Sequence, residues 1–113
     1  ETDDPDATLI VDAFHTWNSG GTLDDLRAIP PDRISHYHID DADPAKPAHT
    51  QKDPDRVMIG DGQIDLGAEI AVLKDIGYDQ TMSLELFNAT LWEQDPLEVI
   101  SLGLERMKEL WAQ

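Results

Sequence analysis

The stretch ISHYHIDDADPAK, residues 34–46, begins with the pattern of a β-strand and ends as an acidic loop. Residues 34–39 alternate between polar and apolar side chains, which is typical of a β-strand, and this alternation places His36 and His38 on one face. Directly after the strand the sequence turns acidic and reaches a proline at position 44. The stretch therefore predicts a strand that carries imidazoles on one face and ends in carboxylates.

The composition indicates one small folded domain with an acidic surface. The chain has 113 residues, of which 40% are hydrophobic, enough for a single core. Its net charge is −16, which argues against nucleic acids and anionic membrane surfaces as partners because little positive charge is available for phosphates. The absence of cysteine excludes disulfides and thiolate chemistry. With no apolar run near about 18 residues and no recognisable signal peptide, we expect a cytoplasmic protein.

Strand and helix patterns alternate along the chain. Three short apolar segments predict β-strands at 7–12, 34–39 and 81–86. A helical pattern follows each of them, and the predicted helices cover 22–29, 67–79 and 95–113. The order β-α-β-α-β-α predicts an α/β fold in which parallel strands are joined by right-handed crossovers.

Capping residues mark the ends of these helices. Thr22 predicts the N-cap of the first helix, and Gly77 the left-handed residue that closes the second. Asp95 followed by Pro96 predicts the start of the last helix. The connection between Asp40 and Leu66 is long and rich in Asp, Pro and Gly, and connections of this length inside compact domains are usually either functional or disordered.

The last predicted helix carries apolar residues at helical spacing. They are Leu97, Ile100, Leu104, Met107 and Trp111. Such a stripe belongs to the core far more often than to a binding site, so we expect it to pack against the sheet.

Three potential metal ligands lie near the ends of the predicted strands. Asp12 closes the first strand, while His38 and Glu85 each lie one residue before the end of theirs. Because parallel strands bring their carboxyl ends to one edge of a sheet, we expect these side chains to meet there. Imidazole with carboxylates suits a divalent cation such as Mn, Co, Fe, Zn or Mg. The alternative is that the three act separately, as a capping Asp, a core His and a surface Glu.

Five stretches resemble successive motifs of the xylose isomerase-like TIM barrel superfamily. They are LIVDAFHTW, HYHIDDADP, DPDRVMIGDGQIDL, LKDIGYDQTMSLELFN and WEQDPLEV. The sequence is most similar to the sugar phosphate isomerases and epimerases, and within them to the inosose isomerase branch. The resemblance implies that residues 1–113 form the C-terminal three βα units of a (β/α)8 barrel, namely strands 6–8 with their helices.

The resemblance also implies roles for individual residues. In this family an Asp, a His and two Glu hold a divalent metal, which corresponds here to Asp12, His38 and Glu85, with Mn, Co, Mg or Zn as the metal. His15, three residues after Asp12, matches a family histidine that contacts substrate oxygens. Arg56 matches a loop arginine near the site that binds substrate, although a salt bridge to an acid of its own loop is an equal alternative.

The implied reaction is the isomerisation or epimerisation of a polyhydroxy ketone, an inosose or a keto-sugar, by proton transfer through an enediolate. Glu85 and His15 would be the catalytic residues, Glu85 moving the proton and His15 orienting or protonating a substrate oxygen. Two other interpretations stay open. One is a dehydratase of the 3-dehydroshikimate type on the same site, and the other is a partial barrel without activity that needs a partner.

Two departures from the family pattern are visible. A (β/α)8 barrel takes roughly 250 residues, and the fourth metal ligand, a Glu on the fifth strand, is absent from this sequence. We therefore expect a fragment, a split subunit or an open assembly, which forms homo-oligomers or pairs with the missing N-terminal barrel half to cover its sheet edges. In the nuclease branch a zinc-binding His would replace Val57, and Val cannot bind metal.

Other polar and aromatic residues near these motifs have ordinary expected roles. We expect His36 to pack inside the barrel and His49 to be solvated. Asp40 or Asp41 is expected to hydrogen-bond the His38 imidazole or to turn the chain.

Overall fold

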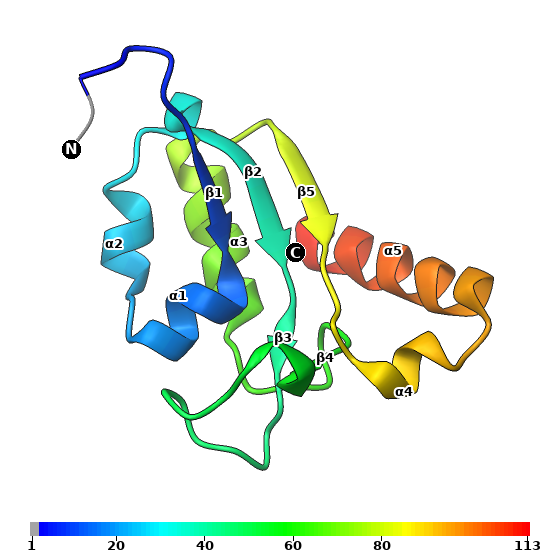
Figure 1. Ribbon diagram of the computed structural model, residues 1–113. Coiled ribbons are helices and arrows are strands. Elements are labelled where there is room, and N and C mark those ends of the chain that lie inside the picture. The colour runs from blue at the N-terminus through cyan, green and yellow to red at the C-terminus, as the bar shows by residue number, and fades with distance from the viewer. Residues whose placement is uncertain (1–2) are drawn as a thin grey trace.

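The computed structural model describes residues 3–113 and contains a parallel sheet of three strands (Figure 1). The strands are β1 (Leu9–Asp12), β2 (Ile34–Ile39) and β5 (Thr81–Leu84), in the order β1-β2-β5. The predicted parallel pairing is confirmed. β1 begins two residues later than expected and β5 ends two residues earlier, whereas β2 has the predicted bounds. Residues 1 and 2 of the expected domain lie outside the described part of the chain.

Five α-helices connect and follow the strands within residues 3–113. They are α1 (Ala13–Ser19), α2 (Leu23–Arg27), α3 (Leu66–Ile76), α4 (Ala89–Trp92) and α5 (Pro96–Ala112). The predicted caps are present: Thr22 forms a capping box with Asp25, Gly77 closes α3 at φ 80°, and the Asp95 carboxylate accepts from the N–H of Leu97. Among these described residues, no helix is both long and apolar enough to span a membrane.

The sequence patterns did not predict α1, which begins immediately after β1. Its first turn is held by Asp12, whose Oδ1 accepts a hydrogen bond of 2.8 Å from the N–H of His15. Gly20 ends the helix at φ 87°. The helix spans only seven residues, too few for a clear hydrophobic period, so its caps were the available signal.

The long connection between β2 and α3 is folded rather than irregular. β3 (Asp41–Ala42) pairs antiparallel with β4 (Arg56–Val57), and a short 3₁₀ turn, Asp53–Asp55, precedes β4. The buried Asp41 carboxylate accepts hydrogen bonds of 2.9–3.0 Å from four backbone N–H groups, those of Ala42, Gly60, Gly62 and Ile64. A Cβ at position 62 would lie 2.1 Å from Asp41 Oδ1, so only glycine fits there. Of the two roles expected for this acid, a hydrogen bond to His38 or a turn in the chain, Asp41 therefore has the second.

The hydrophobic core lies on one side of the sheet. Tyr37 and Ile39 of β2 are fully buried there, as is Leu73 of α3. In Figure 1 the sheet faces the viewer, α3 lies behind it, and α5 passes behind β5 with its C-terminal end and extends to the side of the sheet. On the facing side Ile10 and His36 are exposed, although His36 was expected to be packed, because the described residues supply no second layer there.

The expectation for the last helix was wrong in most of its residues. Four of the five predicted core side chains are 39–72% exposed, namely Leu97, Ile100, Leu104 and Trp111. The helix packs instead through Gly103, with Val99, Met107 and Leu110 beside it. A Cβ on Gly103 would lie 2.3 Å from Leu84 Cδ2, so the missing side chain is what admits Leu84. The helix therefore has two apolar faces, and apart from Met107 the residues that the sequence pattern selected lie on the exposed one.

Candidate metal centre

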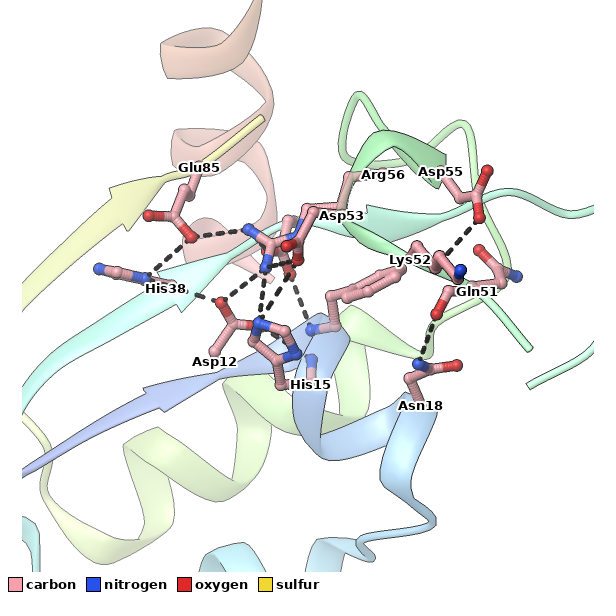
Figure 2. A network of polar contacts seen from close by, with 12 residues as sticks. Asp12, His15, Asn18, His38, Gln51, Lys52, Asp53, Asp55, Arg56 and Glu85 are labelled. Carbon is pink, nitrogen blue, oxygen red and sulfur yellow. Dashed lines mark hydrogen bonds and ion pairs between the residues drawn. The ribbon is translucent and has the colours of Figure 1, made fainter. Parts of the chain in front are cut away.

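The structure brings together the three predicted metal ligands (Figure 2). Asp12 ends β1, His38 lies in β2, and Glu85 directly follows β5. Nδ1 of His38 is 3.6 Å from Asp12 Oδ2 and 3.4 Å from Glu85 Oε2. Two ligand atoms that each lie about 2.1 Å from one ion are about 3–4 Å apart. The donor set and its spacing therefore fit a divalent cation.

The strand register explains why these three side chains meet. Asp12 is aligned with His38, and His38 with Ser83, two residues before Glu85. Side chains two apart on a strand point to the same face. The three side chains consequently point to the face of the sheet that is away from the core, with Asp12 and His38 side by side and Glu85 two residues further along. Asp12 uses Oδ1 to cap α1, which leaves Oδ2 directed at His38.

Arg56 of β4 reaches into the same group of acids. Its side chain is 1% exposed, and Nη1 is 2.6 Å from Glu85 Oε2 and 3.2 Å from Asp40 Oδ2. Nη2 contacts His15 Nε2 at 2.9 Å and Asp53 Oδ1 at 3.1 Å. The salt bridge expected within its own loop is therefore formed with Asp53, and the arginine contacts the ligand set as well.

Two phenylalanines flank the Arg56 guanidinium. Its Cζ lies 5.0 Å from the ring centroid of Phe14 and 5.1 Å from that of Phe87. Both distances are within the range of cation–π attraction. Sequence reasoning did not assign these rings to the arginine, because neither lies near Arg56 in the chain.

Asp40 is a buried acid that faces Arg56. Its Oδ1 accepts a 2.8 Å hydrogen bond from the N–H of Phe14, while Oδ2 points at the guanidinium. Burial, followed by the nearby charge of Asp12, raises the pKa of Asp40 to about 8, against the opposing effect of Arg56. Asp40 thus supports the arginine rather than the imidazole of His38.

Glu85 and His15 are the more accessible members of the site. Burial works to raise the pKa of Glu85, but the hydrogen bond from Arg56 and the charges of His38 and Arg56 outweigh it and lower the pKa overall. The His15 side chain is 62% exposed, and its Nε2 lies 3.6 Å from Asp53. His49 is exposed on the neighbouring loop, as expected, and its N–H donates to Asn18.

A second buried acid lies beneath the site on α3. Glu69 accepts a hydrogen bond from the hydroxyl of Tyr37 on the core side of β2. Burial raises the pKa of Glu69 to about 7, with the Tyr37 hydrogen bond opposing this shift and Asp12 adding to it. Sequence reasoning did not find this pair, because a glutamate in a helix is usually solvated.

Comparison with known proteins identifies the family. The profile described as xylose isomerase-like TIM barrel matches residues 1–110. The chain belongs to this family. Inosose isomerase of Bacillus licheniformis is 37% identical over 102 residues, and that of Bacillus subtilis 36% over 92. These alignments cover 90% and 81% of this chain, but only 36% and 33% of the relatives' length.

Solved structures agree with this assignment. A crystal structure of a protein named IolI with a bound zinc atom matches with a TM-score of 0.86 and 31% identity, over 93% of this chain and 37% of that one. A xylose isomerase domain protein from Alicyclobacillus acidocaldarius matches with a TM-score of 0.85 and 28% identity. This match covers 96% of this chain and 38% of that one. The resemblance stated from the sequence motifs is confirmed, as is the interpretation of the fold as part of a TIM barrel.

Proposed function

We propose that Asp12, His38 and Glu85 hold a divalent metal in a sugar isomerase or epimerase that acts on a polyhydroxy ketone such as an inosose. The observation that carries this proposal is the convergence of the three ligand atoms within 4.8 Å of one another at adjacent strand ends. The names of the relatives, inosose isomerase, support the substrate class. The zinc atom of the IolI structure supports zinc among the candidate metals, with Mn, Co and Mg as the others.

The proposed roles follow from exposure and charge. A divalent cation at these ligands would polarise a bound carbonyl group and make the adjacent C–H more acidic. Glu85, whose side chain is 35% exposed against 10% for Asp12, is the more accessible of the two carboxylates and is placed to accept that proton. His15 faces solvent beside the site and is suited to orient or protonate a substrate oxygen. The burial of Arg56 favours a role in orienting the ligands over direct contact with substrate.

We also propose that the chain acts with a partner, either further copies of itself or a complementary barrel segment. The sheet ends at β1 on one side and β5 on the other, and its outward face and α5 expose large apolar side chains. Light scattering at micromolar concentration tests this proposal. A stable monomer would contradict it for self-association, and addition of a (β/α)1–5 segment of a relative would then test complementation.

The metal proposal is tested by titrating Mn²⁺ and Zn²⁺ into the wild type, His38→Ala and the matched control His49→Ala. We expect His38→Ala to abolish binding, because the only imidazole among the three ligands is lost, and His49→Ala to bind as the wild type does. Equal uptake by wild type and His38→Ala would refute the assignment. Product analysis with inosose and with 3-dehydroshikimate, in the presence of the partner, then separates isomerisation from dehydration.

A further inference from the structure

Arg56 binds the same two carboxylate oxygens that face His38. Asp12 Oδ2 lies 3.6 Å from His38 Nδ1 and 3.5 Å from Arg56 Nη2. Glu85 Oε2 lies 3.4 Å from His38 Nδ1 and 2.6 Å from Arg56 Nη1. Figure 2 shows the guanidinium reaching between these two acids. A metal held by the three ligands would therefore share both of its carboxylate oxygens with a fixed positive charge.

The surroundings of Arg56 are built on the same strand ends as the ligands. Each ligand is followed two residues later by a group that holds the guanidinium, and the pairs are Asp12 with Phe14, His38 with Asp40, and Glu85 with Phe87. The arginine is thus fixed by one side chain from each strand end, in addition to the ligands themselves. This arrangement holds the charge in one place instead of letting it swing into solvent.

The electrostatic consequence has two opposite parts. In the absence of any cation the carboxylates of Asp12 and Glu85, whose oxygens lie within 4.8 Å of each other, would repel, and Arg56 relieves that repulsion. A guanidinium stays charged at every accessible pH, so its positive charge beside these carboxylates cannot be removed by deprotonation. A divalent cation that approaches the same oxygens is repelled by it and must compete for their lone pairs.

We propose that Arg56 is a resident cation of the metal centre, which holds Asp12 and Glu85 in place in the metal-free protein and competes with the metal for their oxygens. This inference rests on the metal-binding function proposed above. Arg56 then sets a lower affinity than the ligands alone would give, so the metal can exchange. It acts as a positioning residue through Asp12 and Glu85.

The test compares Mn²⁺ binding by calorimetry in the wild type, in Arg56→Gln, and in Arg27→Gln as a charge-matched control. Arg27 pairs with Asp75 on the surface, so its loss removes one positive charge from the protein without touching the site. We expect Arg56→Gln to bind Mn²⁺ at least about tenfold more tightly, and to have a lower Tm without metal and a larger rise in Tm on metal addition. Arg27→Gln should match the wild type in all three measurements.

An arginine that only supports the structure gives the opposite result, because looser ligands bind metal more weakly. Equal or weaker binding by Arg56→Gln than by the wild type overturns the inference and leaves the metal function standing. Binding by neither protein refutes the metal function and the inference together.

If Arg56→Gln does not fold, Phe87→Leu decides the question. Phe87 is 41% exposed, so leucine is tolerated there, but the ring face over the guanidinium is lost. Because Phe87→Leu holds the guanidinium less firmly beside the ligands, this variant should bind Mn²⁺ about threefold more tightly than the wild type. Unchanged affinity overturns the inference.

Discussion

The carboxyl ends of the strands and the outer face of α5 differ in whether their side chains have partners within the chain. At the strand ends, acids, imidazoles and Arg56 contact one another over distances of 2.6–3.6 Å. Along α5, Leu97 and Ile100 are 72% and 63% exposed. Polar groups need specific partners at short range, and neighbouring strands of this chain provide them. Apolar side chains need a large covering surface, and a chain of 113 residues does not supply enough of it to cover both the sheet and its helices. The three candidate ligands and Arg56 thus meet within the chain, whereas the apolar surface of the chain is only partly covered.

The largest expected effect comes from breaking the scaffold of the polar region. Asp41→Asn removes one carboxylate oxygen that accepts from Gly60 and Gly62 and places an amide against their N–H groups. We expect a loss of about 4 kcal/mol in the free energy of unfolding, measured by urea denaturation. Asp79→Asn, an exposed acid, is the control and should change the free energy by less than about 0.5 kcal/mol. A loss below 1 kcal/mol for Asp41→Asn (about the worth of one ordinary hydrogen bond) would contradict the description of this loop as a folded element.

A smaller effect should follow from the pH dependence of the acid beneath the site. Since the folded pKa of Glu69, about 7, is above its unfolded value of 4.5, the folded state binds more protons between these values. Its contribution to stability is therefore present below about pH 4.5 and is lost as pH rises toward 7, by up to about 3 kcal/mol. Glu69→Gln should lack this part of the pH dependence in denaturation curves recorded from pH 5 to 8.

Glu98→Gln changes an exposed acid of α5 and is the matched control for Glu69→Gln. Its pH profile should follow that of the wild type. Identical profiles for Glu69→Gln and the wild type would show that Glu69 is not the group responsible.

The smallest effect on folding is expected on the outer face of α5. Ile100→Lys should change the unfolding free energy of the isolated chain by less than about 0.5 kcal/mol but should weaken association, measured by light scattering. Gly103→Ala, on the packed face of the same helix, should instead cost about 2 kcal/mol because its Cβ meets Leu84. If Ile100→Lys were the more destabilising of the two, the assignment of packed and exposed faces would be reversed.

Local signals in the sequence predicted the elements that depend on neighbouring residues. The alternation in residues 34–39 gave β2 with its observed bounds, and Thr22 and Gly77 marked helix ends that the structure contains. α1 and the β3–β4 pair were missed, since elements of seven and two residues carry no measurable period. The convergence of the three candidate ligands was predictable because strand order and parallel pairing alone align Asp12 with His38.

The sequence by itself determined the parallel α/β order, the family and the three side chains that meet at the strand ends, because each follows from short-range pattern and strand direction. Only the tertiary structure decided which of the two apolar faces of α5 packs against the sheet. Leu84 comes so close to the helix that only the face containing Gly103 can receive it. The tertiary structure also decided the surroundings of Arg56. Phe14, Asp40 and Phe87 are far apart in the chain, and only the docking of the loop between β2 and α3 onto the strand ends brings them to one guanidinium.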